Sequence, residues 1–232
     1  MLKAKDRLII ALDVPTPEDA RKLINQLGGT VGVYKIGLEL LFAGGVPLMD
    51  KLLNSGHKVF VDAKLLDIGN TVERTVTNIA RLGATFLTIH GTDRKTLDAA
   101  VRGRGNSALK LLAITVLTNL QQQDLNEQGI TMPGDKLVEH RAKLAHDAGF
   151  NGVVASGFEA AQIRKLCGPG FNIITPGIRP SGSESGDQAR IVTPGKAIGS
   201  GADYIVVGRP ITEAVDPLKA ATDIVAEIEA AL

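Results

Sequence analysis

The chain has 232 residues, of which 44% are hydrophobic and 22% charged, and its formal net charge is +1. This balance predicts a globular protein and argues against a nucleic-acid-binding surface, since only 3% of the residues are aromatic and could stack on bases. No apolar run is long enough to span a membrane, the first residues lack a signal-peptide pattern, and the single Cys167 excludes an internal disulfide, so we expect a cytoplasmic protein.

Short apolar runs rich in β-branched residues alternate with longer amphipathic stretches along the whole chain. The amphipathic stretches predict helices, and several of them end in glycine, as helices commonly do. Four clear examples are residues 17–27, 47–56, 71–83 and 133–149. The predicted strands are residues 7–13, 33–37, 58–62, 85–90, 109–116, 152–156, 171–175 and 203–208.

Eight strands in this length give about 29 residues for each strand–helix unit, which is typical of a (β/α)8 or TIM barrel. The strands are apolar on both faces, as parallel strands covered by helices must be. No linker or low-complexity segment divides the chain, so we expect residues 1–232 to form a single α/β domain. A doubly wound open sheet is the alternative, but no glycine fingerprint follows the first strand.

The loops after the carboxyl ends of the strands build the active site of such a barrel. Ionisable side chains stand at five of the predicted strand ends, which favours a functional site over scattered surface charges. These side chains are Asp13, Lys35, Asp62, Lys64, Arg179 and Arg209.

The loops after strands seven and eight carry the features of a phosphate site. Arg209 directly follows Gly208, and Arg179 lies two residues after a glycine. Glycine lets backbone N–H groups approach an anion, and arginine offers a planar pair of donors to its oxygens. Gln188 could add an uncharged donor. The alternative is a pair of surface arginines, but a phosphorylated ligand is the better interpretation.

The segment VFVDAKLLD, residues 59–67, carries charge out of an apolar strand. Asp62 and Lys64 are two residues apart, so the pleat predicts that both side chains point into the barrel mouth. Lys35 on the neighbouring strand and Asp67 would complete an array of alternating charges. The flanking carboxylates favour a charged lysine, which is a proton donor rather than a Schiff-base nucleophile. A purely structural ion-pair network is the alternative.

The histidines and the cysteine do not suggest a metal site or a nucleophile. We interpret His90, at the end of the fourth strand, as a supporting or structural residue. His57, His140 and His146 fall in predicted helices or turns and should lie on the surface. Cys167, at the end of a helix pattern, should be a packing residue.

These segments resemble the bacterial type of the orotidine 5′-phosphate decarboxylase family, essentially from end to end. The matching segments are LDV (12–14), YKIG (34–37), DAKLLDIGNTV (62–72), TVLT (115–118), residues 174–194 and IVVGRPI (205–211). Leu65, Leu66 and Gly69 stand where relatives often have an aromatic residue, a histidine and a proline, and none of the three positions bears a charge that the chemistry needs.

The resemblance implies a TIM barrel that decarboxylates orotidine 5′-monophosphate to uridine 5′-monophosphate, in the last step of de novo pyrimidine biosynthesis, without a metal or cofactor. Lys64 would donate the proton to C6 of the pyrimidine, and Asp62 would lie against the departing carboxylate. Asp13 and Lys35 would contact the ribose hydroxyls.

The remaining implied contacts concern the base, the phosphate and a partner subunit. Thr118 would lie near the base. The phosphate would be held by Arg179, Gln188, Gly208 and Arg209. The composition of residues 181–187, which are polar and rich in glycine and serine, separately predicts a loop that closes over the phosphate when substrate binds. The resemblance also implies a homodimer with shared active sites, completed in each case by the partner's copies of Asp67, Ile68 and Thr71.

Two other functions are compatible with parts of this pattern. A metal-dependent hexulose- or gulonate-phosphate lyase uses a similar barrel and motif, but has a glutamate where this chain has Lys35, which would repel a divalent cation. A non-catalytic nucleotide-binding barrel is the second, although binding alone gains nothing from a strained pair of charges. Decarboxylation is the favoured prediction.

Overall fold

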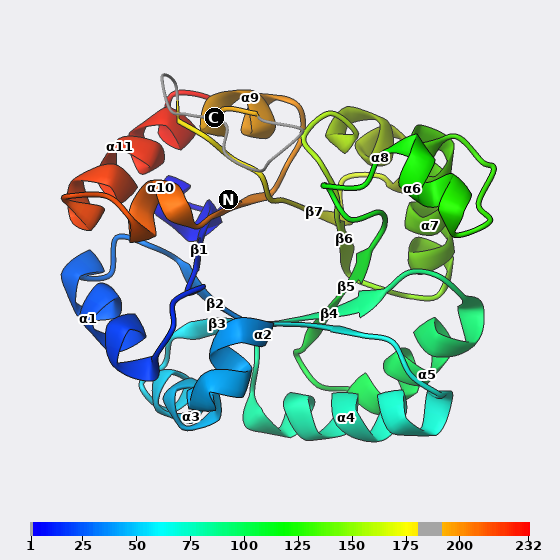
Figure 1. Cartoon of the computed structure of the whole chain (residues 1–232), viewed down its shortest axis with the longest axis horizontal. Coiled ribbons are helices and arrows are strands. Elements are labelled where there is room, and N and C mark those ends of the chain that lie inside the picture. Colours follow the sequence, from blue (N-terminus) through cyan, green and yellow to red (C-terminus); the bar gives the residue numbers. More distant parts are fainter. Residues whose placement is uncertain (1, 181–191) are drawn as a thin grey trace.

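The computed structural model describes residues 2–180 and 192–232, and these form a closed barrel of parallel strands inside a ring of helices (Figure 1). Each strand pairs with the next along the chain, and the eighth pairs with the first. The strands are β1 (Leu8–Ala11), β2 (Val33–Gly37), β3 (Lys58–Leu65), β4 (Phe86–His90), β5 (Lys110–Ile114), β6 (Gly152–Val154), β7 (Asn172–Thr175) and β8 (Tyr204–Val207). The predicted (β/α)8 barrel is therefore confirmed.

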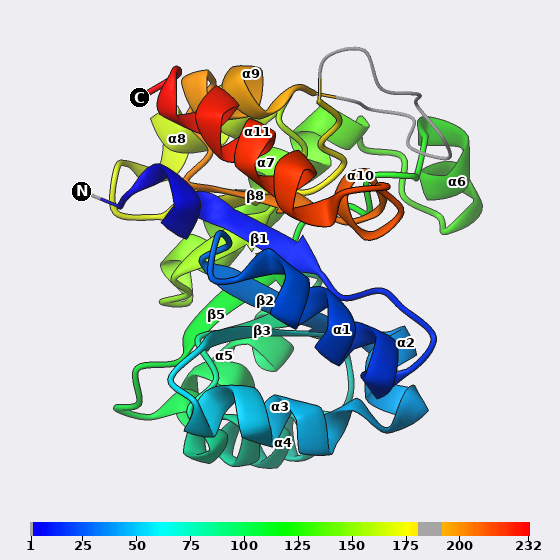
Figure 2. The same cartoon turned by 90° about the vertical axis from the view of Figure 1, so that its left-hand side faces the viewer.

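The helices lie on the outside of the barrel in both views of the chain (Figures 1 and 2). They are α1 (Pro17–Leu27), α2 (Leu38–Leu40), α3 (Val46–Asn54), α4 (Gly69–Leu82), α5 (Arg94–Arg104), α6 (Gln122–Glu127), α7 (Gly134–Asp147), α8 (Ala160–Cys167), α9 (Pro194–Gly199), α10 (Arg209–Thr212) and α11 (Pro217–Glu229). A 3-10 turn, Ala4–Arg7, precedes β1, and a π-helical turn, Leu41–Gly45, joins α2 to α3. None of the helices in the described ranges is both long and apolar enough to cross a membrane.

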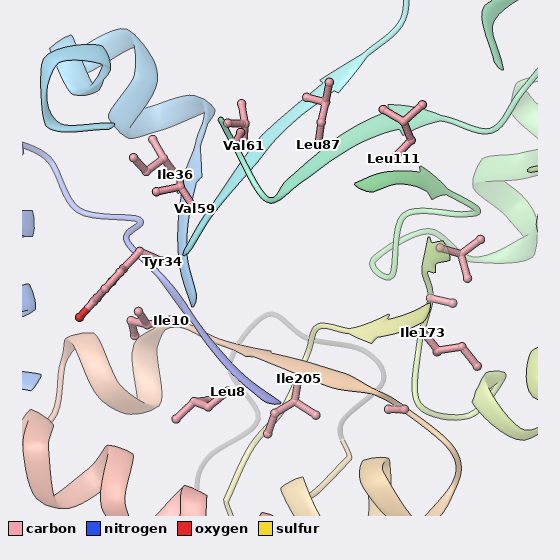
Figure 3. Packing of buried hydrophobic residues seen from close by; sticks show 14 of the residues in the cluster. Leu8, Ile10, Tyr34, Ile36, Val59, Val61, Leu87, Leu111, Ile173 and Ile205 are labelled. Carbon is pink, nitrogen blue, oxygen red and sulfur yellow. The ribbon is translucent and has the colours of Figure 1, made fainter. Parts of the chain in front are cut away.

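Alternate residues of each strand pack on opposite sides of the barrel wall, as the pleat requires. Outward-facing residues such as Ile10, Val59 and Leu87 belong to the larger core between strands and helices, and Figure 3 shows their side chains directed away from the barrel axis. Apolar inward-facing residues form a second core inside the barrel. Its members are Ile9, Ala11, Val33, Phe60, Phe86, Leu112, Ile174, Tyr204 and Val206.

Three aromatic rings of this inner core stack edge to face. The ring centroids of Phe60 and Phe86 lie 5.8 Å apart, and those of Phe86 and Tyr204 lie 5.2 Å apart. Bulky interdigitated rings of this kind leave a packed interior rather than a channel. The barrel therefore has an apolar floor, and polar chemistry is confined to its carboxyl-terminal mouth.

Several predicted strand ends differ from the structure. β1 ends at Ala11 rather than Asp13, and β5 and β6 are shorter than predicted by two residues or more. β3 is longer than predicted, since it continues through Asp62 to Leu65. It does so across an irregularity, because its register with β4 shifts between Val61 and Leu65.

Candidate active site

A cavity of about 500 Å³ opens at the carboxyl ends of the strands. Its floor is apolar and includes Phe60, Ile114 and Val206, whose side chains point inward from three different strands. Its wall carries most of the charged residues predicted from the sequence, together with Thr118 and Gly208. The charged lining residues are Asp13, Lys35, Glu39, Asp62, Lys64, Arg179, Arg209 and Glu213.

Four of these residues form a continuous row of alternating charges. Lys35 Nζ lies 2.9 Å from Asp13 Oδ1 and 3.4 Å from Asp62 Oδ2. Lys64 Nζ lies 2.8 Å from the same Oδ2 atom of Asp62. Lys35 and Asp62 are buried, whereas the Asp13 side chain is 48% exposed and that of Lys64 is 32% exposed. The buried centre of the row is thus neutralised internally, and Lys64 remains open to a ligand.

The regular pleat of a strand does not account for the position of the Lys64 side chain, so the prediction that the pleat directs it is wrong. Lys64 has a φ of 47°, and it is the sole non-glycine residue in the described ranges with a positive φ. This left-handed conformation costs a residue with a Cβ roughly 1–2 kcal/mol. It coincides with the register shift on β3, so a bulge, and not regular alternation, directs Lys64 toward Asp62.

Asp62 and His90 both favour their deprotonated forms. Burial alone would raise the pKa of Asp62, but the charges of Lys35 and Lys64 and the hydrogen bonds that the carboxylate accepts hold its pKa below the usual value. Burial, with the positive charges of Arg141 and Lys64, lowers the pKa of His90. The site therefore contains an ionised carboxylate at Asp62, whereas His90, which does not line the cavity, favours its neutral form.

Thr88 was missed in the sequence, although it touches two of the predicted site residues. Its hydroxyl donates to Asp62 Oδ1 at 2.8 Å and accepts the Lys64 backbone N–H at 2.9 Å. Thr88 stands at an inward-facing position of β4, between Phe86 and His90. The sequence feature that could have indicated this role is a threonine between two apolar residues at an inward-facing position of the strand.

The two arginines that line the cavity differ in their burial. Arg179 is buried, its backbone N–H donates to Val192 O at 3.1 Å, and its Nη1 donates to Ile178 O at 2.9 Å. Arg209 begins α10 directly after Gly208 and is exposed. Both line the cavity. Gln188 and the loop at 181–187 lie outside the described residues.

Asp67, Ile68 and Thr71 do not line the cavity of their own chain. All three are exposed, and Asp67 Oδ1 accepts the Ile68 N–H at 2.6 Å. They follow the bulged end of β3, where the chain turns outward into α4. Within one chain these three residues are therefore separated from the ligand cavity.

The other histidines and the cysteine lie where the sequence predicted. His57, His140 and His146 are exposed. Cys167 is buried at the end of α8, and burial raises its pKa, so the thiol form is favoured. In residues 2–180 and 192–232 no group of three or more acidic, histidine or cysteine side chains is arranged to hold a metal ion.

Gly37 makes room for the charge row, and replacing it with alanine tests how tightly the row is packed. A Cβ atom at Gly37 would lie 2.8 Å from Asp13 Oδ1 and 3.1 Å from Lys35 Nζ. We expect Gly37→Ala to displace both groups and to reduce kcat/KM by about 10- to 100-fold, since misplacement by about 1 Å can have this effect. Gly170→Ala is a suitable control, because a Cβ atom there would have no neighbouring atom within 4 Å. Equal kcat/KM in the Gly37 variant and the wild type would contradict the prediction.

Comparison with known proteins places these features in a family. A family model described as "Orotidine 5'-phosphate decarboxylase / HUMPS family" matches residues 6–224. An orotidine 5'-phosphate decarboxylase of Rhodopseudomonas palustris (strain BisB5) is 53% identical over 224 residues, which cover 97% of this chain and 95% of the relative. The enzyme of that name from Methylobacterium nodulans is 53% identical over 230 residues, covering 98% of this chain and 97% of the relative. The crystal structure of orotidine 5'-phosphate decarboxylase from Lactobacillus acidophilus matches with a TM-score of 0.84 at 36% identity, covering 95% of this chain and 98% of that chain.

Proposed function

Because the chain belongs to the orotidine 5'-phosphate decarboxylase / HUMPS family, we propose that it is a carboxy-lyase that converts orotidine 5′-monophosphate to uridine 5′-monophosphate in pyrimidine biosynthesis. The observation that carries this proposal is the Asp13–Lys35–Asp62–Lys64 row in one cavity with two arginines. The substrate carries a carboxylated pyrimidine, a ribose and a phosphate, and this cavity offers chemistry suited to each of them.

The reaction needs a positive charge beside C6 of the pyrimidine. When the bond from C6 to the carboxylate breaks, its electron pair stays on C6 and CO₂ leaves, and no adjacent π-system can absorb the charge. The Lys64 ammonium stabilises this developing carbanion and then donates its proton to C6. The proton lost from Nζ is recovered from solvent, and the partial exposure of Lys64 permits this.

Asp62 is proposed to act on the carboxylate that departs. Two carboxylates about 4 Å apart repel by about 4 kcal/mol at an effective dielectric constant near 20. This repulsion is relieved when neutral CO₂ leaves. The repulsion therefore disfavours the bound substrate more than the transition state. The low pKa of Asp62 supports this role, because only the ionised form repels.

The other contacts bind and orient the nucleotide. Asp13 and Lys35 are proposed to hold the ribose hydroxyls, and Thr118 to lie near the base. The phosphate is assigned to Arg179, Gln188, Gly208 and Arg209. Binding energy from this distant group helps to hold the reacting end in its strained arrangement.

The donor set favours a reaction without a metal ion. Asp62, the most buried carboxylate of the row, already faces two ammonium groups, within 3.4 Å and 2.8 Å. Magnesium binds through oxygen ligands and would be repelled by these neighbouring charges. A metal-dependent lyase activity on the same barrel is therefore the less favoured function.

We further propose that the protein is a homodimer in which Asp67, Ile68 and Thr71 complete the active site of the partner. These residues are exposed and separated from the cavity of their own chain. Large apolar side chains are also exposed in the segments that follow β2 and β3, as expected of a surface that another subunit covers. They are Leu38, Phe42, Val46, Leu66 and Ile68.

A substrate panel tests the proposed reaction against the two rivals. The purified protein, treated with a chelator, is incubated with orotidine 5′-monophosphate or with a hexulose 6-phosphate, and each reaction is repeated with added Mg²⁺. We expect UMP and CO₂ in equal amounts from the nucleotide, at the same rate with and without Mg²⁺. Turnover of the sugar phosphate only with Mg²⁺ would support the lyase, and binding without turnover would support the nucleotide-binding barrel.

A further inference from the structure

The hydroxyl of Thr88 joins the two residues to which the central chemistry is assigned. Its proton is directed to Asp62 Oδ1, at 2.8 Å, and one of its lone pairs accepts the Lys64 N–H, at 2.9 Å. Thr88 is fully buried, so water cannot replace either bond without entering the barrel wall. It does not line the cavity and therefore does not touch a ligand there.

The bond to Asp62 determines how the carboxylate is oriented. Oδ2 accepts from Lys64 Nζ and faces Lys35, while Oδ1 accepts from Thr88. Oδ1 is thus bound to β4, whereas Oδ2 lies against Lys64 of the same strand and Lys35 of β2, and these contacts together hold the plane of the carboxylate. Without the hydroxyl, Asp62 could rotate about its side-chain bonds while remaining close to both ammonium groups.

The bond to the Lys64 backbone holds the strained part of β3. At this residue the ladder with β4 is interrupted, and regular pairing resumes only with Leu65 and Ile89. The left-handed conformation of Lys64 is unfavourable for a residue with a Cβ and persists only where its surroundings enforce it. Across this interruption the Thr88 hydroxyl accepts the Lys64 N–H.

We infer that Thr88 is a positioning residue that holds the Asp62 carboxylate and the Lys64 backbone in their reactive arrangement through a single buried hydroxyl. The inference rests on the proposed decarboxylase function. It assigns Thr88 no contact with substrate, so its loss should reduce the rate of the chemical step and leave substrate binding nearly unchanged.

Three substitutions separate positioning from general stability. Thr88→Val removes the hydroxyl at nearly constant shape, Thr88→Ala removes it without placing a methyl group against Asp62, and Thr88→Ser keeps it. Thr175→Val is the matched control, because Thr175 is also a fully buried strand threonine, and its hydroxyl has no hydrogen-bond partner among the described residues. Steady-state kinetics with orotidine 5′-monophosphate and amide hydrogen exchange at Lys64 are measured on all four and on the wild type.

We expect Thr88→Val and Thr88→Ala to lower kcat by about 10- to 100-fold, with KM changed by less than about threefold. Exchange of the Lys64 N–H should accelerate by about tenfold or more in both, since its acceptor is lost. Thr88→Ser and Thr175→Val should resemble the wild type in both measurements.

Wild-type kcat in either variant that lacks the hydroxyl, or an equal loss in Thr88→Ser, would overturn the inference. A parallel rise in KM would also overturn it, since it would indicate a binding role. If the wild type itself does not decarboxylate the nucleotide, the proposed function fails, and exchange at Lys64 still decides whether Thr88 holds this backbone. If one variant does not fold, the other provides the result.

Discussion

Replacing Lys64 with alanine is expected to lower kcat for decarboxylation by about 10⁴-fold or more, because this one group is proposed to supply both the charge that stabilises the C6 carbanion and the proton that quenches it. Affinity for UMP should change little, since Lys64 is assigned to neither the ribose nor the phosphate. Single-turnover kinetics and calorimetric titration with UMP measure the two quantities separately.

Lys58→Ala is the matched control, because Lys58 is an exposed lysine at the opposite end of the same strand. It should retain wild-type kcat. Turnover by Lys64→Ala within tenfold of the wild type would remove Lys64 from the chemistry. Loss of UMP binding in step with turnover would instead indicate that the row of charges collapses without it.

Mixing two inactive variants is expected to restore activity if the active sites are shared between subunits. Lys64→Ala and Asp67→Ala homodimers should each be nearly inactive, since every site lacks one of the two groups. In a mixed dimer each site combines Lys64 of one subunit with Asp67 of the other. One site therefore carries both substitutions and the other carries neither. Random subunit exchange makes about half of the dimers mixed, so about a quarter of all sites should recover.

The structure of one chain explains why this experiment is decisive. Asp67 is exposed and its carboxylate accepts the neighbouring Ile68 N–H, outside its own cavity. If Asp67 served its own subunit, no site in the mixture would be intact, and activity would remain at the level of the single variants. The rate of decarboxylation by the mixture, before and after subunit exchange, divided by the wild-type rate at the same total concentration of sites, gives the fraction recovered.

The fold could be predicted because its signals repeat. Each βα unit has an apolar strand and an amphipathic helix, and the count of eight with short connections leaves few alternatives to the barrel. Charges that follow a buried strand also predict where a site lies, because all the carboxyl ends of a parallel barrel meet at one mouth. Asp13, Lys35 and Asp62 could therefore be assigned to one cavity from their positions in the sequence, and all three line it.

The local geometry of Lys64 could not be predicted in the same way. Regular alternation assigns Asp62 and Lys64 to one face, and they do meet, but through a bulge and a left-handed residue. Such a bulge depends on the neighbouring strand β4, because Thr88 on that strand accepts the backbone N–H of Lys64 and so stabilises its conformation. A contact between residues 24 positions apart leaves no pattern within either strand.

The central claim is that CO₂ leaves from C6 and that a proton from an exchangeable group, proposed to be Lys64, takes its place, and the most direct test is the reaction in D₂O followed by proton NMR. The ammonium protons of Lys64 exchange with solvent, so the UMP formed should carry one deuterium at C6 and hydrogen at C5. The H6 signal should be absent, and H5 should appear as a singlet. UMP with hydrogen instead of deuterium at C6, or with deuterium incorporated at C5, would contradict direct protonation of a C6 carbanion by an exchangeable group.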